Sequence, residues 1–287
     1  MNKIKKIAKS IWEICFDVDK NITGLSKEDS LLWSDTNSIR HAHTIRTILD
    51  YIDRNNKSSL NILNASGLGC GHSDFSIVSY LRKNTHIDIK WKSLDSPDST
   101  FLANNLFRDY IERLKIELDL IDFSKINGSD EFKGPDYDIV LFTEIAEHLD
   151  HSSLLEILIA IRKKIKEGGI LIITTPNLLR LENRMRMLLG NADGPYWGDG
   201  RENLEKGLYG HIVNYDVKRL RRLLIDTGFK AVSVYTFTPG RGASQKTLLR
   251  YIFYKIIDVL SFFAKYFKAE IFMVAVKSDA VKIPPKM

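Results

Sequence analysis

The feature that most limits how this chain can fold is a glycine-rich turn between a predicted strand and a predicted helix. The apolar run 61–65 leads into Gly67, Gly69 and Gly71, and a helical pattern follows over 73–83. Glycines at this spacing allow a tight turn and let a ligand come close to the main chain. The helix behind the turn offers free N–H groups and the positive end of its dipole. The turn therefore predicts one of two things. Either a ligand binds at the end of the strand, or the glycines only allow the helix to pack closely against the strand.

The spacing of the glycines separates this turn from three other motifs. A dinucleotide-binding fingerprint needs a glycine at the position of His72. The phosphate-binding loop of nucleotide hydrolases and the glycine–serine–glycine elbow of serine hydrolases are both absent from the sequence. ATP hydrolysis and serine hydrolysis are therefore disfavoured, and a ligand without a pyrophosphate group fits the turn better.

Strands and helices alternate after the turn. Apolar strands are predicted at 61–65, 87–94, 115–121, 137–143 and 170–175, with helices at 73–83, 98–113 and 152–167. This alternation is typical of a parallel sheet with helices on both faces. The order then changes to a helix at 215–227 and strands at 229–238 and 271–277, which predicts a hairpin-like pair at the end of the sheet. Two further helices are predicted before the alternation, a short amphipathic one at the N-terminus and one at 38–54.

Composition excludes several classes of protein. The 287 residues are 44% hydrophobic and 27% charged, as in ordinary globular proteins and unlike disordered chains. With only Cys15 and Cys70, the chain has no four-cysteine zinc site and no C-x-x-C redox pair. The net charge of +6 permits an anionic partner without requiring one. No apolar run approaches the ~20 residues of a membrane span, and no secretory signal is recognisable, so we expect a cytoplasmic protein.

Four segments follow from these patterns. We expect a helical cover at residues 1–60 and one α/β domain at 61–278. Within the domain, the glycine-rich segment 177–210 is predicted to be an insertion or lid rather than part of the core. An aromatic helical insertion is predicted at 240–269, before the last strand. Residues 246–268 of this insertion combine aromatic and basic side chains. We expect them to pack in the core or at a homodimer contact, and the alternative is peripheral contact with a membrane.

Two carboxylates follow successive strands of the predicted sheet. Asp95 ends the strand at 87–94, and Asp122 follows the strand at 115–121. The first can accept hydrogen bonds from both hydroxyls of a ribose, and the second can accept one from an exocyclic amine. Each has another explanation by itself, as a helix cap or as a turn residue. Their joint place at the carboxyl ends of the strands, where doubly wound sheets bind ligands, favours a binding site.

With these residues the chain resembles the class I S-adenosylmethionine-dependent methyltransferases over residues 38–277. The resemblance rests on Gly67-Leu68-Gly69-Cys70-Gly71, Asp95, Asp122, the stretches 137–149, 166–177 and 210–215, and Thr227-Gly228-Phe229. It implies a Rossmann-like, doubly wound sheet of seven strands whose last strand is antiparallel. It also implies S-adenosylmethionine as the cofactor.

The resemblance assigns roles to individual residues. The glycine turn would shape the methionine pocket, Asp95 would hold the ribose and Asp122 would approach the adenine. The whole predicted cofactor set is Asn64, Gly67, Gly69, Gly71, Asp95, Asp122, Phe123 and Thr143. The family usually has Asp or Glu near the end of the first strand, whereas this chain has Asn64 and Ala65. Asn64 can still accept a hydrogen bond, but it carries no charge.

An acidic and histidine-rich cluster follows the strand at 137–143. On a helix, Glu144, Glu147 and His148 share one face, and His211 could close the site from the lid. These four residues could bind a divalent ion such as Mg²⁺ or Mn²⁺. Such a motif is similar to that of the ubiquinone-biosynthesis O-methyltransferases and of the small-RNA 3′-terminal 2′-O-methyltransferases. The alternatives are a metal-free site, with His148 or His211 as the general base beside Glu144, and a purely structural cluster.

The expected acceptor is a hydroxyl group of a sugar, a glycan or another small molecule. Aromatic-rich insertions before the last strand occur in similar bacterial glycan-modifying methyltransferases, and Tyr196, Trp197, Arg201 and Tyr209 would line the acceptor side. One alternative is metal-dependent methylation of a vicinal diol, such as a catechol or a terminal ribose. Another is a cofactor-fold partner subunit without activity. No dense basic stripe appears in the sequence, so we do not expect a nucleic-acid partner.

Overall fold

The computed structural model describes residues 3–66, 72–121, 136–190, 211, 213–239, 256, 259–260 and 266–278. The strand order is β3-β2-β1-β4-β5-β7-β6, and β7 is antiparallel to both of its neighbours. The predicted α/β fold, with seven strands and an antiparallel last strand, is therefore confirmed. The chain divides into two compact units, which we describe separately. The first holds the described residues up to Ile121 and 136–141, and the second holds those from Phe142 to Thr238 and from 266 onward.

The first unit contains the parallel strands that carry Asn64 and Asp95. They are β1 (Ser59–Asn64), β2 (Asp88–Asp95), β3 (Glu117–Leu120) and the start of β4 (Tyr137–Thr143). β1 pairs with β2 and β4, and β2 also pairs with β3. Because all these strands are parallel, their carboxyl ends meet at one edge of the sheet, where Asn64 and Asp95 lie.

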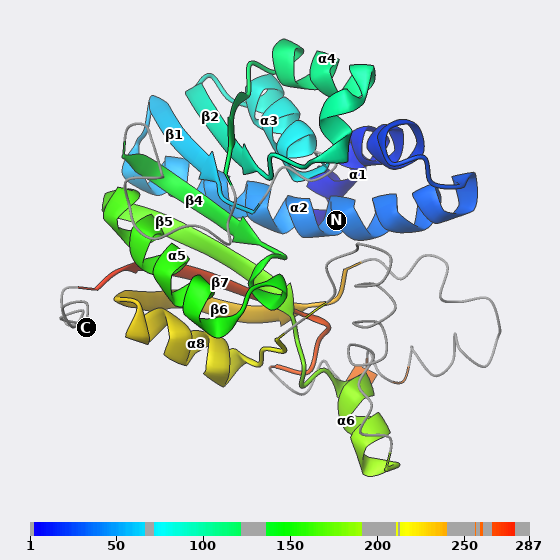
Figure 1. Cartoon of the computed structure of the whole chain (residues 1–287), viewed down its shortest axis with the longest axis vertical. Coiled ribbons are helices and arrows are strands. Elements are labelled where there is room, and N and C mark those ends of the chain that lie inside the picture. Colours follow the sequence, from blue (N-terminus) through cyan, green and yellow to red (C-terminus); the bar gives the residue numbers. More distant parts are fainter. Residues whose placement is uncertain are drawn as a thin grey trace. The chain divides into compact units, whose positions relative to one another are not determined.

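The N-terminal helices share the apolar core of the first unit. α1 (Lys3–Asp17) leads through a π-helical turn, η1 (Val18–Ile22), into α2 (Lys27–Asn55). Both helices contact each other and α3 (His72–Asn84), as Figure 1 shows. Their inward side chains are buried isoleucines, namely Ile4, Ile7, Ile11, Ile45 and Ile48. Each stabilises the fold by about 1.5–3 kcal/mol relative to exposure, so these helices are structural parts of the unit.

Two predicted helices differ from the observed ones. α2 begins at Lys27 instead of Ser38, because Ser26 caps it and accepts a hydrogen bond from the Asp29 N–H at 3.1 Å. The helix predicted at 98–113 is divided into a 3₁₀ turn, η2 (Thr100–Ala103), and α4 (Asn105–Arg113). Asn104 separates them, since its extended backbone ends the first and its side chain caps the second at 3.2 Å.

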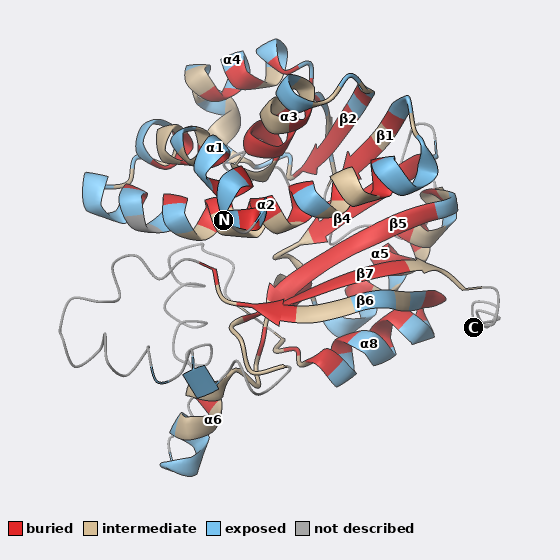
Figure 2. Cartoon of the chain, turned by 180° about the vertical axis from the view of Figure 1, so that it is seen from behind, coloured by how far each residue is buried: buried red, intermediate tan, exposed pale blue. Residues whose placement is uncertain are grey.

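The second unit is built on three long strands. They are β5 (Ile165–Pro176), β6 (Phe229–Phe237) and β7 (Glu270–Lys277). β5 and β7 are buried along most of their length, as Figure 2 shows. The helices of this unit are α5 (His151–Lys164), α6 (Leu181–Leu188) and α8 (Val217–Asp226), with a 3₁₀ turn, η5 (Ala146–His148), before α5. α8 packs on β6 and buries its leucines, which gives it one apolar face and one polar face.

The two predicted insertions are only partly described. Residues 177–190 of the predicted lid include α6, while Tyr196, Trp197, Arg201 and Tyr209 lie outside the described residues. Most of 240–269, including most of 246–268, also lies outside them. Within the described part of the chain, none of the helices has the length and apolar character needed to cross a membrane.

A substitution at Gly228 can test how tightly the second unit is packed around Arg162. Its φ is +79°, and a Cβ placed there would lie 2.7 Å from Arg162 Nε, which donates to the Gly228 carbonyl at 2.9 Å. In Gly228→Ala we expect the free energy of unfolding to fall by about 2 kcal/mol, from left-handed strain and the displaced guanidinium. Urea unfolding measures it. The control is Gly168→Ala, at φ +74° with open space around it, which adds the strain alone. Equal losses in the two variants would contradict a role for the Arg162 contact.

Candidate functional site

Asn64 is part of the interior of the first unit. It is fully buried at the end of β1. Its amide donates to the Asp74 carboxylate at 2.8 Å, and its Oδ1 accepts from the Ser66 N–H at 3.2 Å. Asn64 therefore connects the end of the strand to the first turn of α3. The glycine turn itself, with Gly67, Gly69 and Gly71, lies outside the described residues.

Asp95 lies at the carboxyl edge of the sheet, as predicted. It is the last residue of β2 and is 5% exposed. Its Oδ1 accepts from the Ser96 N–H at 2.8 Å, and its carbonyl accepts from the Ile121 N–H at 2.7 Å. The ends of two adjacent strands are thus held together at this carboxylate. Asp122 and Phe123, which follow directly, lie outside the described residues, and Thr143 is the half-buried last residue of β4.

A contact between Asp19 and His72 joins the N-terminal helices to the start of α3. Asp19, in the π-helical turn, is 1% exposed and lies 2.6 Å from Nε2 of His72. One turn along α3, Ser76 Oγ lies 2.8 Å from Nδ1 of the buried His41. Burial holds the pKa of His41 well below its ordinary value, and the charges of His72 and Arg40 lower it further. The residue that follows the glycine turn is therefore fixed by the N-terminal helices, a contact that no motif in the sequence indicated.

Glu144 does not share a helical face with Glu147 and His148, so that prediction is wrong. Its φ is +56°, in the left-handed region that non-glycine residues rarely adopt. The Glu144 N–H donates to the Thr174 carbonyl at 3.0 Å, and its carboxylate accepts from Thr174 Oγ1 at 2.8 Å. The chain therefore continues its hydrogen bonds to β5 past the end of β4 and then reverses, which leaves only a 3₁₀ turn for Glu147 and His148.

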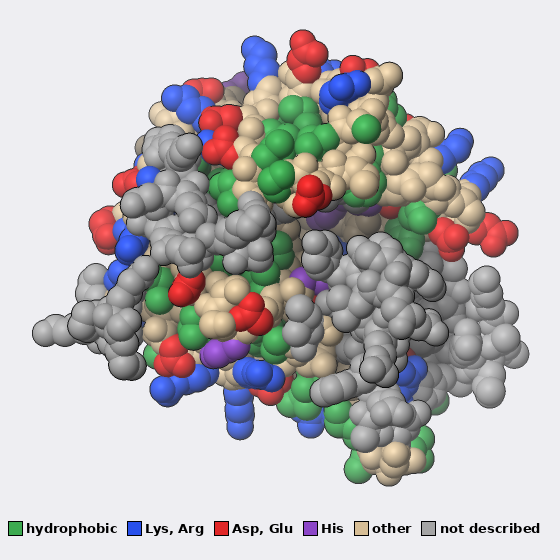
Figure 3. Space-filling view, in the orientation of Figure 1, with side chains coloured by type: hydrophobic (Ala, Val, Ile, Leu, Met, Phe, Trp, Pro, Cys, Tyr) green, Lys and Arg blue, Asp and Glu red, His purple; other side chains and the backbone are tan. Residues whose placement is uncertain are grey.

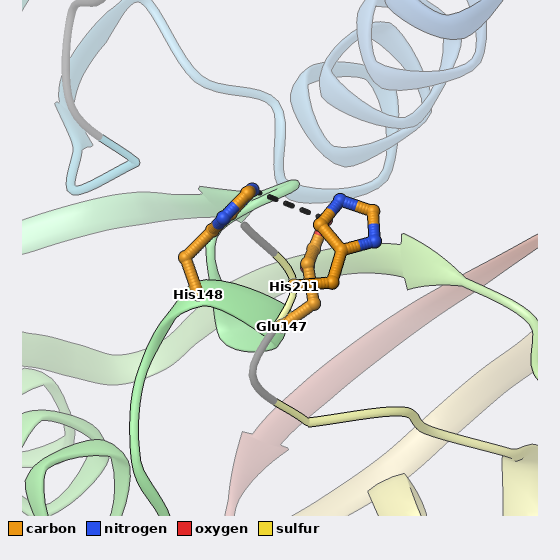
Figure 4. Close-up of side chains that lie close together, drawn as sticks. All are labelled: Glu147, His148 and His211. Atoms are coloured by element: carbon orange, nitrogen blue, oxygen red, sulfur yellow. Dashed lines mark ion pairs between the residues drawn. The ribbon is translucent and has the colours of Figure 1, made fainter. Parts of the chain in front are cut away.

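Glu147, His148 and His211 form the acceptor cluster, as we name these three residues of the second unit. Their ligand atoms all lie within 4.8 Å of one another. The imidazole rings have centroids 4.8 Å apart and an interplanar angle of 77°, and Figure 4 shows the three side chains close together. Glu147 Oε1 lies 4.0 Å from His148 Nε2, and its other oxygen accepts from Thr175 Oγ1 at 2.8 Å. Residues 63 positions apart in the chain are thus brought together.

The position of His211 follows from a main-chain hydrogen bond nearby. The Val213 N–H donates to the Glu147 carbonyl at 3.1 Å, which holds Val213, two positions after His211, beside the 3₁₀ turn. Tyr215 follows and is 1% exposed. Burial raises the pKa of Tyr215 to about 12, the charge of Arg219 opposes this, and that of Glu147 adds to it. Tyr215 is therefore a neutral phenol next to the acceptor cluster, and sequence reasoning did not single it out.

The acceptor cluster has the groups for two kinds of chemistry. An imidazole can accept a hydroxyl proton, and a carboxylate nearby stabilises the imidazolium that results. Two imidazoles and one carboxylate are also a donor set for a divalent metal. Ligand atoms about 2.1 Å from one ion lie about 3–3.5 Å apart unless they are on opposite sides of it, so binding a metal would require the side chains to move closer together.

Comparisons with known proteins agree with this fold. A family model described as a methyltransferase domain matches residues 41–234. The solved structure of magnesium protoporphyrin IX methyltransferase from Synechocystis PCC 6803, with bound SAH, has a TM-score of 0.53 and 13% identity, covering 96% of this chain and 99% of that chain. An S-adenosylmethionine-dependent methyltransferase from Clostridium acetobutylicum ATCC 824 has a TM-score of 0.51 and 12% identity, covering 93% and 98%. Such identities show the fold alone. No curated protein matches the chain significantly by sequence.

Proposed function

Because the chain belongs to the methyltransferase domain family, within the class I S-adenosylmethionine-dependent superfamily, we propose that it methylates an oxygen atom of its acceptor. The observation that carries this proposal is the acceptor cluster, in which two imidazoles and a carboxylate meet just after β4. Hydroxyl groups need a base to become nucleophiles, and imidazole is the side chain suited to that task near neutral pH.

The described residues of the first unit fit the cofactor. Asp95 places a carboxylate at the edge where parallel sheets bind ligands, and one carboxylate can accept from both ribose hydroxyls. When bound, S-adenosylmethionine supplies a methyl group on a positively charged sulfur. His148 or His211 would accept the proton of the acceptor hydroxyl, and Glu147 would stabilise the positive charge that the imidazole gains. The chain therefore contributes orientation and proton transfer, and no covalent intermediate is needed.

A sugar or glycan hydroxyl is the acceptor class that we propose. The aromatic-rich insertions of the sequence support it, because aromatic faces with scattered polar groups suit a sugar. On the face shown in Figure 3, the described Lys and Arg side chains are scattered among Asp and Glu, in keeping with an acceptor other than nucleic acid. A cytoplasmic location, a homodimer and membrane contact through 246–268 remain proposals that rest on the sequence.

The acceptor class can be tested directly. The purified protein is incubated with S-adenosylmethionine and a panel of uridine diphosphate sugars, methyl glycosides, a catechol and a primary amine. Release of S-adenosylhomocysteine measures turnover, and mass spectrometry locates the added methyl group. Methylation of a sugar oxygen is the expected result. Methylation of the amine alone would overturn the proposal of oxygen chemistry, and the absence of S-adenosylmethionine binding by calorimetry would favour the inactive partner subunit.

The two imidazoles and the carboxylate of the acceptor cluster support a second candidate function, the metal-dependent methylation of a vicinal diol. Removal of metal ions with a chelator distinguishes this function from a metal-free reaction that uses a histidine as the general base. We expect turnover in excess EDTA to stay within about twofold of the untreated rate, because a general base needs no ion. The assay uses whichever panel acceptor is methylated. A fall in turnover that Mg²⁺ or Mn²⁺ restores, together with a preference for the catechol, would establish the metal-dependent alternative instead.

A further inference from the structure

Asp74 is a buried carboxylate that the proposed reaction does not use directly. It lies in the first turn of α3 and has no exposed surface. Four side chains donate hydrogen bonds to it: Trp91 Nε1 at 2.7 Å, Asn64 Nδ2 at 2.8 Å, Ser73 Oγ at 3.1 Å, and Ser93 Oγ. All these donors are neutral. A buried carboxylate without a cation is costly unless its hydrogen bonds are satisfied. The four donors at Asp74 therefore favour a carboxylate at this position over other side chains.

Opposing effects act on the negative charge of Asp74. Burial raises the pKa of the carboxyl above its ordinary value, and the hydrogen bonds from Ser93, Asn64, Trp91 and Ser73 act in the opposite direction. The start of α3 adds the positive end of a helix dipole, which stabilises an anion in the first turn. These contacts fix both the orientation of the carboxylate and the place of its charge.

Asp74 and Asn64 connect the two ends of the glycine segment. Asn64 Nδ2 donates to Asp74 Oδ2, and Asn64 Oδ1 accepts from the Ser66 N–H at 3.2 Å. Ser66 comes directly before Gly67, and Asp74 comes three positions after Gly71. The hydrogen-bond chain from Ser66 through Asn64 to Asp74 therefore holds the residues on either side of the predicted cofactor turn.

We propose that Asp74 is a positioning residue of the cofactor site, which supplies through Asn64 the negative charge that the end of β1 lacks. The inference rests on the proposed function, because it concerns the same cofactor. Because Asn64 is already held by Asp74 and by the Ser66 N–H, it needs no reordering when a ligand binds at the end of β1. The Asp74 carboxylate next to Asn64 would also attract the positively charged sulfonium and ammonium groups of the cofactor.

A charge exchange between the two residues provides the test. Asp74→Asn removes the charge and turns the amides of residues 64 and 74 toward each other, so the Kd for S-adenosylmethionine should rise at least about tenfold. Asn64→Asp brings two carboxylates together and should also weaken binding. In the double variant Asn64→Asp/Asp74→Asn, the donor and acceptor are exchanged and one charge remains, so binding should return to within about threefold of wild type, as in a coupled pair.

The measurement is calorimetric titration with S-adenosylmethionine, and a thermal melt of each variant accompanies it. Asp138→Asn is the matched control, since Asp138 is a carboxylate of the same unit, 2% exposed, that accepts from Lys57 at 2.8 Å and the Asn61 N–H at 2.9 Å. It lies near the amino end of β4 and should lower the melting temperature without changing Kd. A folded Asp74→Asn variant with wild-type Kd would overturn the inference, as would a double variant that regains stability but not affinity. If the wild type itself fails to bind, the proposed function fails instead.

Discussion

Replacement of His148 with alanine is expected to lower kcat about a hundredfold or more, while the Kd for S-adenosylmethionine stays the same. The reason is that removal of a general base typically costs a factor of about 10²–10⁴ in rate, whereas Asn64 and Asp95 of the predicted cofactor set lie on β1 and β2. The measurement is initial-rate kinetics with whichever panel acceptor is methylated, beside calorimetric titration with the cofactor. Loss of rate without loss of cofactor affinity would identify proton transfer or acceptor binding as the step affected.

Variants of two other histidines, His211 and His151, provide a second test and a control for that experiment. His211→Ala should give a loss of similar size, and the double variant little more, because residues that act as a unit are not additive. His151→Ala is the control, since this exposed histidine begins α5 only three positions beyond His148. It should leave kcat unchanged. An unaffected kcat in both His148→Ala and His211→Ala would contradict the assignment of the base to the acceptor cluster.

The second large effect is expected at Asp95. In Asp95→Ala the Kd for S-adenosylmethionine should rise about a hundredfold, which corresponds to about 2.8 kcal/mol. This is the size expected from losing two hydrogen bonds between a carboxylate and the ribose hydroxyls. Calorimetric titration measures it, with a thermal melt to show that the variant is folded. Asp88→Ala, at the exposed start of the same strand, is the control and should bind normally; equal Kd values in the two variants would rule out the ribose contact.

Most strands could be predicted closely from the sequence, because apolar runs bounded by turn residues have few other ways to bury their side chains. The exception is β5, which begins at Ile165, where a helix to residue 167 is predicted. Tyr137–Thr143 is observed as predicted, and Asp95 ends its strand as expected. The early start of α2 is also predictable, since Ser26 followed by Asp29 is a local N-cap signal, and the Ser26 hydroxyl accepts from the Asp29 N–H and donates to its carboxylate. Such features depend on neighbours in the sequence, which makes them accessible without the fold.

The details of the sites depended on tertiary contacts. The left-handed conformation of Glu144 is set by hydrogen bonds to Thr174, thirty positions away, and no local pattern predicts it. The network around Asp74 draws on Trp91 and Ser93 of the adjacent strand. His211 was chosen correctly as a residue near His148 only because a motif pointed to it, and the contact with Glu147 depends on the Val213 main chain.

The register of β5 against β7 determines where Glu144 and Glu147 of the second unit are held. Thr174 and Thr175 are neighbours on β5, so their side chains point to opposite faces of the strand, and they hold Glu144 and Glu147 respectively. In the observed register they lie opposite Phe272 and Ile271. A slip of one residue would exchange the two faces. A one-residue deletion early in β5 would therefore turn the two threonine side chains away from Glu144 and Glu147, even though every residue of the acceptor cluster is intact.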